Sequence, residues 1–430
     1  MKRTGTLAAI VVCLGCGTLQ LDDVEADPAS AAAALGDDPT RPTDGDWPAY
    51  RGAHRNGIST DGDWQTTWPA AGPKRLWTAE VGLGYSAVSV ADGKAATLGH
   101  RDGEETVYCF DAADGRELWK HSYPGKLVDN LHLGGPGASP TFDRGRLFTL
   151  GKEGQLHAFD VATGRVLWKV DVRGRFETPL PEWGFTSSPL AVGDKLLIDV
   201  GGLAALDVRT GEVAWRGATY RAGYGSPVLM KSAVDAAPLV AHVTNDGLVI
   251  VRLDDGREIA RYDWTSQYVT TATTPIVRGR TIFLSTGYGG GCALLEFDGA
   301  RLTELYRNDA LSTHMNTPVS LGGRLYGIDG NSHSPRQCKL VCLDPSRGER
   351  LWEQRGFGCG ALSAAGGKLL IMSDDGFLSV AEASPEGYRE LAKTKVFDDH
   401  TWTMPVLARG RIYCRSESGQ VVCLDVRKPR

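Results

Sequence analysis

The sequence predicts an all-β protein, an eight-bladed β-propeller whose blades are four-stranded antiparallel sheets. A motif that recurs about every 40–50 residues and eight strand openings with the same period predict this fold. A strand motif divided between the two ends of the chain indicates how the ring closes. The 54 glycines among 430 residues agree with a fold that is rich in tight turns.

The recurring motif is an apolar strand ending in Asp, a four-residue turn ending in Gly, and Trp eight positions after the Asp. Asp favours the turn because its carboxylate accepts backbone N–H groups, and Gly supplies the positive φ that closes it. We expect each Trp to be buried against the neighbouring blade. The four copies with strict spacing are Asp111 with Trp119, Asp160 with Trp168, Asp207 with Trp215, and Asp344 with Trp352. Degenerate copies are at Asp254, Asp298, Glu382 and Asp425.

The strand openings are Ser-Pro or Thr-Pro pairs and variants of them, and Pro is tolerated at the first residue of a strand. The last period stops at Asp425 without its Trp strand, whereas residues 74–78 form a Trp strand with no Asp turn before it. An N-terminal strand that joins the C-terminal blade would close the ring and remove its exposed edges. We therefore expect the propeller to span residues 74–430, with residues 47–73 packed as an N-terminal strap on its outside.

Residues 1–16 have the pattern of an export signal, with Lys2 and Arg3 before an apolar run too short to span a bilayer. The end of this segment resembles a bacterial lipobox, which implies lipidation of Cys16, although Cys13 stands where leucine is usual. Plain signal cleavage is the alternative. With either interpretation the protein leaves the cytoplasm. We expect it in the cell envelope, in the periplasm or at the outer membrane, as a lipid-anchored protein that contacts the membrane only through that anchor.

Residues 17–46 contain seven Asp, Glu25 and only Arg41, a net charge of −7 that predicts an acidic low-complexity tether. With the +2 of the first residues, this accounts for the whole net charge of −5, so residues 47–430 are neutral overall. A domain without net charge has no electrostatic reason to bind nucleic acid, so we expect no nucleic-acid partner.

We also expect the protein to be a monomer.

Seven cysteines follow Cys16, an odd number that cannot all form disulfides. If Ser418-Gly419 is a two-residue hairpin turn, Cys414 and Cys423 face each other across two strands, which permits but does not require a disulfide. We expect the others to be small buried hydrophobic residues. They are Cys109, Cys292, Cys338, Cys342 and Cys359.

The Asp-turn-Gly-x-x-x-Trp motif resembles the blade signature of the pyrroloquinoline-quinone-like (PQQ-like) repeat propellers, over essentially all of residues 47–430. Within that superfamily the chain is similar to a group of exported bacterial proteins that open with Trp47-Pro48-Ala49-Tyr50-Arg51-Gly52. The architecture is shared with the propeller lipoprotein of the outer-membrane β-barrel assembly machine, which binds a protein partner and no quinone.

The quinoprotein dehydrogenases of this superfamily need an Asp base, carboxylate and amide ligands for Ca²⁺, and commonly two adjacent cysteines. No cysteines are adjacent in this sequence, and it has no zinc-protease, phosphate-loop or EF-hand motif. We therefore expect a binding or assembly scaffold with no metal, no cofactor and no nameable catalytic residue. An oxidoreductase that uses PQQ with Ca²⁺, or another cofactor, on alcohols or sugars is the alternative.

The loops that lead from each outer strand into the next innermost strand are long and aromatic, and in a propeller they converge around the central channel. They predict a concave site at the channel mouth for a protein or polysaccharide partner. The alternative is that these aromatic side chains fill the channel and make their contacts with one another rather than with a partner. The candidate ligand-binding residues are His132, Trp183, Phe185, Tyr224, Tyr268, His314, Asn316, His400 and Trp402.

Overall fold

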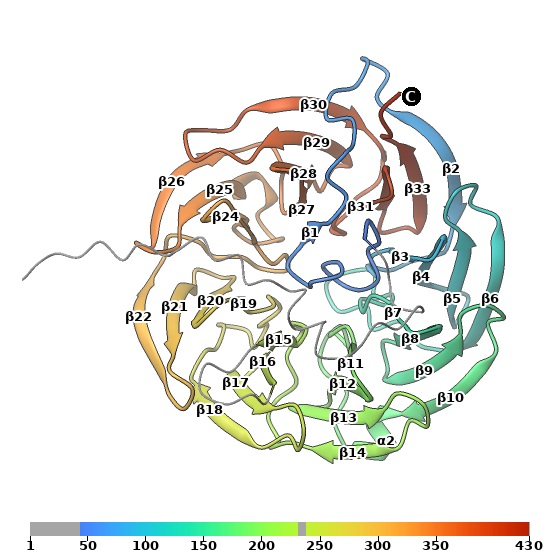
Figure 1. The fold of residues 1–430 in the computed structure, drawn as a ribbon, viewed down its shortest axis with the longest axis vertical. Coiled ribbons are helices and arrows are strands. Elements are labelled where there is room, and N and C mark those ends of the chain that lie inside the picture. The colour runs from blue at the N-terminus through green and yellow to red at the C-terminus, as the bar shows by residue number, and fades with distance from the viewer. Residues whose placement is uncertain (1–43, 231–237, 430) are drawn as a thin grey trace, which may run out of the picture.

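The computed structural model describes residues 44–230 and 238–429, whose strands form eight sheets arranged in a ring (Figure 1). Within these residues the helical elements are the single turn α2 (Val172–Phe176) and the 3₁₀ turn η1 (Pro335–Gln337). The prediction of an all-β, eight-bladed propeller is confirmed. The expected signal segment, Cys16 and nearly all of the expected tether lie outside the described residues.

Six of the blades are antiparallel sheets of four strands that follow one another in chain order from the axis to the circumference. The first three blades are β3 (Ser89–Ala91), β4 (Lys94–Arg101), β5 (Glu104–Asp111) and β6 (Glu117–Pro124); β7 (Thr141–Asp143), β8 (Arg146–Leu150), β9 (Gln155–Asp160) and β10 (Val166–Asp171); and β11 (Leu190–Val192), β12 (Lys195–Asp199), β13 (Leu203–Asp207) and β14 (Val213–Arg216). The next three are β15 (Val228–Met230), β16 (Leu239–Thr244), β17 (Gly247–Arg252) and β18 (Glu258–Tyr262); β19 (Ile276–Arg278), β20 (Thr281–Thr286), β21 (Gly291–Phe297) and β22 (Leu302–Asn308); and β23 (Val319–Leu321), β24 (Arg324–Asp329), β25 (Lys339–Asp344) and β26 (Glu349–Gln354).

The last two blades include strands from the N-terminal part of the chain. The seventh blade is β27 (Ala361–Ala365), β28 (Lys368–Met372), β29 (Phe377–Glu382) and β30 (Glu390–Lys395), with β1 (Ile58–Ser59) added in parallel to β27. The eighth is β31 (Val406–Ala408), β32 (Arg411–Arg415) and β33 (Gln420–Asp425), with β2 (Lys74–Glu80) antiparallel to β33. The N-terminal strand therefore closes the ring as predicted.

The start of the strap does not lie on the outside of the propeller, as the sequence analysis expected. Its chain crosses the centre of the ring (Figure 1), where Trp47 pairs with Val90 of β3. The guanidinium of Arg51, which is 2% exposed, donates to the carbonyl oxygens of Thr317 and Pro318 at 2.9 and 2.8 Å. Apart from β27, which pairs with β1, the innermost strands have no neighbouring strand on the axis. The strap therefore supplies donors to carbonyls that would otherwise be buried without partners.

Each motif Trp is held by the next blade through the same hydrogen bond. The indole Nε1 of Trp119 donates to Val161 O at 2.9 Å, and that of Trp168 donates to Val208 O at 3.1 Å. The motif glycine of the next blade lies against the ring, because a Cβ on Gly211 would come within 2.7 Å of Trp168. Gly211 also has φ +73°, so both space and backbone conformation require glycine there.

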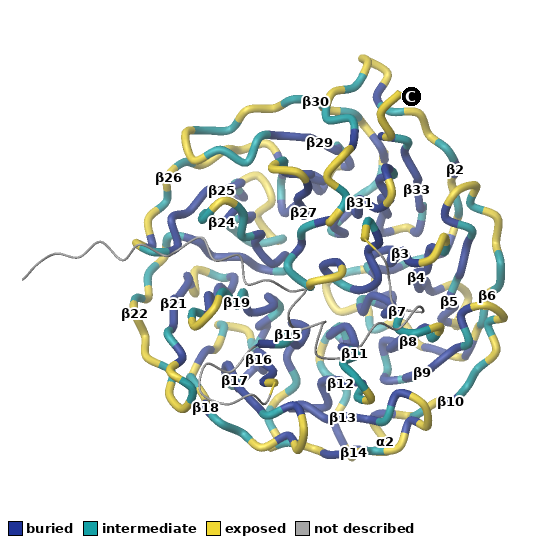
Figure 2. The backbone as a smooth tube through the Cα atoms, viewed as in Figure 1, coloured by how far each residue is buried: buried dark blue, intermediate teal, exposed yellow. Residues whose placement is uncertain are grey.

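The expected burial of the motif tryptophans is correct for two of the strict copies. Trp168 and Trp215 are 9% and 8% exposed, whereas Trp119 and Trp352 are only half-buried. The outer strands that carry these residues alternate between buried and exposed positions, while the middle strands are buried almost throughout (Figure 2). The motif aspartates cap their turns as predicted, as in the bond from Ala113 N to Asp111 Oδ1 at 2.8 Å. Equivalent backbone bonds are accepted by Asp160, Asp207 and Asp344.

The two-residue turn that would place Cys414 opposite Cys423 does not form. Cys414 is paired with Val422 and Cys423 with Tyr413, so the two cysteines lie on opposite faces of the blade. The reason is that the hairpin connection spans residues 416–419 rather than two residues, which changes the register by one step. All seven cysteines in the described part of the chain are free and buried.

We predict that the Trp168→Ala substitution will lower the free energy of unfolding by about 3–5 kcal/mol, as for other buried aromatic residues replaced by Ala. Gly211→Ala should also destabilise the protein, because its new Cβ would collide with the same ring. The half-buried Trp352 is the matched control, and its replacement by Ala should cost less. Urea unfolding of the three variants measures these effects, and an equal loss for Trp168→Ala and Trp352→Ala would contradict the prediction.

Candidate functional site

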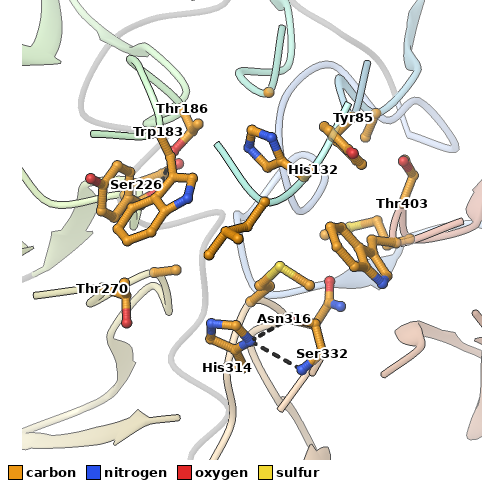
Figure 3. A pocket seen from close by; sticks show the side chains of 18 of the residues that line it. Tyr85, His132, Trp183, Thr186, Ser226, Thr270, His314, Asn316, Ser332 and Thr403 are labelled. Carbon is orange, nitrogen blue, oxygen red and sulfur yellow. Dashed lines mark hydrogen bonds between the residues drawn. The ribbon is translucent and has the colours of Figure 1, made fainter. Parts of the chain in front are cut away.

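A cavity of about 200 Å³ lies on the propeller axis, and side chains from several blades surround it (Figure 3). Its lining comes from the loops that enter the innermost strands and from the turns between the second and third strands of several blades. These two sets of connections lie on the same face because strand direction alternates within a blade. The strap residue Tyr50 also contributes to the lining.

Most of the predicted binding residues line this cavity. Trp183 is fixed by a hydrogen bond from its Nε1 to Asn130 O at 3.1 Å, and its ring contacts Tyr224 edge-on at 5.6 Å between centroids. Asn316 is fixed by its side-chain amide, which donates to Gly360 O at 2.8 Å. The predicted residues in the lining are His132, Trp183, Tyr224, His314, Asn316 and Trp402.

The other predicted residues do not line the cavity. Phe185 is 3% exposed and belongs to the hydrophobic core between the second and third blades, where it packs beside Gly154. Tyr268 is 53% exposed and touches the ring of Tyr288, a lining residue, at 4.6 Å between centroids. His400 lies behind Trp402, with 4.8 Å between their ring centroids, and its Nδ1 bonds Glu417 at 2.8 Å.

Sequence reasoning missed the lining residues that come from the turns between second and third strands, such as Lys152, Tyr288 and His333. The order of the strands could have indicated these residues. Because strand direction alternates, the turns between second and third strands lie on the same face as the loops that lead into the innermost strands. Sequence reasoning also missed Tyr85, whose ring stacks on Trp402 with 5.5 Å between centroids. Burial, followed by the hydrogen bond to Glu417, raises the pKa of Tyr85, so its hydroxyl stays protonated.

Two histidines of the cavity wall, His132 and His314, are neutral hydrogen-bonding groups at pH 7. Burial lowers the pKa of His314 to about 4, with a smaller contribution from the nearby His333. The Nδ1 of His314 accepts a bond from Ser332 N at 3.3 Å (Figure 3). Burial also lowers the pKa of His132, and the charge of Lys152 adds to that effect.

The cavity does not offer the ligands that a divalent cation needs. Among the described residues, no group of three or more His, Cys, Asp or Glu side chains could hold a metal ion. The described lining contains no Asp and no Glu, the residues that Ca²⁺ prefers. The residues present therefore do not fit a quinone held beside Ca²⁺.

The ring of Asp-turn-Trp blades around an axial cavity defines the class of PQQ-like repeat propellers. A family model described as "Outer membrane protein assembly factor BamB" matches residues 103–354, which is more than half of the chain. The chain therefore belongs to this family. A comparison with curated proteins found no match.

Solved structures with the same fold include both an assembly factor and dehydrogenases. BamB from Moraxella catarrhalis is 16% identical, with a TM-score of 0.60 over 82% of this chain and 99% of that one. A europium-containing methanol dehydrogenase is 14% identical, with a TM-score of 0.65 over 89% of this chain and 90% of that one. Quinohemoprotein alcohol dehydrogenase from Comamonas testosteroni is also 14% identical, with a TM-score of 0.61 over 94% and 84%. These likenesses establish the fold alone.

Across residues 44–230 and 238–429, the structure contains no helix with the length and apolar character needed to cross a membrane.

The ion pair of His400 with Glu417 predicts a pH-dependent contribution to stability. The hydrogen bond to Glu417 raises the pKa of His400, so that contribution is present below about pH 6.5 and is lost as the pH rises through the folded-state value. Burial acts to raise the pKa of Glu417, but bonds from His400 and Tyr85 outweigh burial and lower it. The contribution of the Glu417 carboxylate to stability is therefore lost only when the pH falls through its lowered pKa.

We predict that His400→Gln will lower the melting temperature more at about pH 5.5 than at about pH 9, where wild-type His400 has lost its charge. Thermal unfolding followed by circular dichroism at the two pH values measures this difference. Glu417→Gln is the matched variant, because it removes the other half of the same ion pair. An equal loss at both pH values for His400→Gln would show that the charge makes no contribution.

Proposed function

We propose that the protein is an exported binding scaffold of the cell envelope that holds a protein partner at the channel-mouth face. The observation that carries this proposal is an exposed apolar loop beside the axial aromatic cavity. In the connection between β6 and β7, Leu127, Leu131 and Leu133 are 36%, 75% and 45% exposed. Clustered exposed apolar side chains of this size commonly mark interaction sites.

The loop is held in place by polar contacts on both sides of its tip. Leu133 N donates to the hydroxyl of Tyr85 at 3.2 Å, and the side-chain amide of Asn130 donates to Glu182 at 2.8 Å. Leu131 has φ +61°, a left-handed conformation that is costly for leucine, and its side chain extends to the cavity mouth. A fixed backbone that presents leucine in this way lowers the entropy lost when a partner binds.

Membership in a family described by outer-membrane protein assembly supports a protein as the partner. A scaffold requires a complementary surface and no catalytic groups, which agrees with a cavity wall that is largely aromatic, apolar and polar and has Lys152 as its one Lys or Arg among the described residues. The export signal expected at residues 1–16 supports the envelope location, with Cys16 as the proposed anchor.

Photo-crosslinking in intact cells tests this proposal. With p-benzoylphenylalanine in place of Leu131, we expect a protein adduct that Trp402→Ala reduces, because the partner also contacts the cavity. Arg347 is the control position, since its side chain is 65% exposed on the turn between β25 and β26, at the opposite face. Two results would contradict a protein partner at this face. One is an adduct that glycosidase degrades and protease does not, and the other is equal labelling from positions 131 and 347.

We propose a cofactor-dependent oxidoreductase as the second candidate function. The observation in its favour is the TM-score of 0.65 with a methanol dehydrogenase, together with an aromatic cavity on the axis. The lack of carboxylates in the described lining weighs against the Ca²⁺-assisted form.

Purified protein incubated with PQQ and Ca²⁺ tests the second function. On the scaffold proposal we expect no bound-quinone absorbance and no alcohol- or sugar-dependent reduction of a dye. A known quinoprotein dehydrogenase assayed in parallel controls for the quality of the reagents. Turnover that depends on added PQQ would establish the oxidoreductase function instead.

A further inference from the structure

The turn between β8 and β9 places a lysine in the wall of the axial cavity. Lys152 is 1% exposed and lines the cavity, and its backbone carbonyl accepts a bond from Phe185 N at 2.8 Å. Its side chain crosses directly over Gly184, because a Cβ there would lie 2.7 Å from Cγ and 2.9 Å from Cδ of Lys152. The stem of Lys152 is therefore fixed between the cavity and the loop that carries Trp183.

The ammonium group of Lys152 has no hydrogen-bonding or ion-pair partner in the part of the chain that the structure describes. Among the described residues no hydrogen bond or ion pair is made by its Nζ, and the lining contains no carboxylate. Glu105 lies behind it, but that carboxylate accepts the backbone N–H of Lys152 at 2.9 Å and the hydroxyl of Tyr123 at 3.0 Å. Burial lowers the pKa of Lys152 to about 8, while Glu105 acts to raise it, so the amine remains mostly protonated at pH 7.

Other lining residues also have polar atoms without partners. Buried side-chain atoms with no hydrogen-bond partner among the described residues include His132 Nδ1, Trp402 Nε1 and Thr403 Oγ1. Buried polar atoms left unpaired cost free energy, and a ligand in the cavity that paired with these three atoms would recover part of that cost. An unpaired buried ammonium has the largest such cost.

We propose that the axial cavity binds an organic acid, with a single carboxylate on the Lys152 ammonium and an aromatic or apolar ring among Tyr85, Trp183 and Trp402. A carboxylate is the complement of a lone buried ammonium, because the pair neutralises the charge and gains charge-assisted hydrogen bonds. The aromatic wall accounts for the ring. This site goes beyond partner docking, because it defines the chemistry of a ligand inside the cavity.

The ligand carries one negative charge rather than several. Lys152 is the one Lys or Arg in the described lining, and burial lowers the pKa values of His132 and His314 there. A polyanion would therefore bury charges that no side chain of the wall could neutralise. Two sources provide the proposed chemistry: a free small acid, or the carboxyl terminus of a peptide that ends in an aromatic residue.

Calorimetry on the purified protein tests the proposal with indole-3-acetate and its uncharged analogue indole-3-acetamide. We expect wild-type protein to bind the acid at least about tenfold more tightly, as one charge-assisted hydrogen bond predicts. Lys152→Met should abolish this preference and Lys152→Arg should retain it. Lys126→Met, which removes an exposed lysine from the neighbouring loop, is the matched control and should leave the preference unchanged.

The wild-type comparison keeps the proposal falsifiable even if Lys152→Met does not fold. Equal binding of the two indoles, or binding of neither, would overturn it, as would tighter binding of the polyanion PQQ than of indole-3-acetate. A peptide ending in Trp with a free carboxyl terminus, compared with its amidated form, identifies the source. A free-carboxyl peptide that binds more tightly than indole-3-acetate supports a peptide terminus, and the reverse order supports a small acid. These results are independent of crosslinking at Leu131, so the two proposals can fail separately.

Discussion

The antiparallel pairing of β2 with β33 is the contact on which the rest of the structure depends. It joins the first long strand of the propeller to the last, with Lys74 opposite Asp425 and Glu80 opposite Gln420. Without it the eighth blade would have three strands, and the ring would expose unpaired edges. The cavity takes its lining from loops of several blades, so its geometry exists only when this pairing has closed the ring.

The closure also adds one more member to a set of similar contacts between blades. In each, an aromatic side chain on the outer strand of one blade donates a hydrogen bond to a backbone carbonyl of the next blade along the chain. Trp77 of β2 donates to Ala112 O of the first blade at 3.2 Å, which is the bond that Trp119 and Trp168 make to their following blades. The fifth blade uses Tyr306, whose hydroxyl donates to Pro345 O at 2.7 Å. At the interfaces where both contacts occur, a single hydrogen bond and a ring packed against glycine thus set the spacing between neighbouring blades.

The strap gives the two faces of the propeller different chemistry. At one end of the channel, the Arg51 guanidinium is fully paired with backbone carbonyls, including those of Thr317 and Asn56. At the cavity wall, the Lys152 ammonium makes no hydrogen bond or ion pair with the described residues, and His132 Nδ1 has no partner among them. An aromatic cavity wall and an anchored apolar loop together favour binding at the loop face, which both proposals require.

The sequence by itself determined the propeller, its closure and the face that holds the cavity, because Asp, Gly and Trp fix turns and blade contacts by local chemistry. It also placed Trp183 and Asn316 at the cavity. Tertiary structure alone decided that Phe185 is core and that Lys152 is buried without a partner. Burial and pairing depend on segments distant in the chain, so no local pattern encodes them. The same reason explains the strap, whose position follows from carbonyls that only the assembled inner strands expose to the axis.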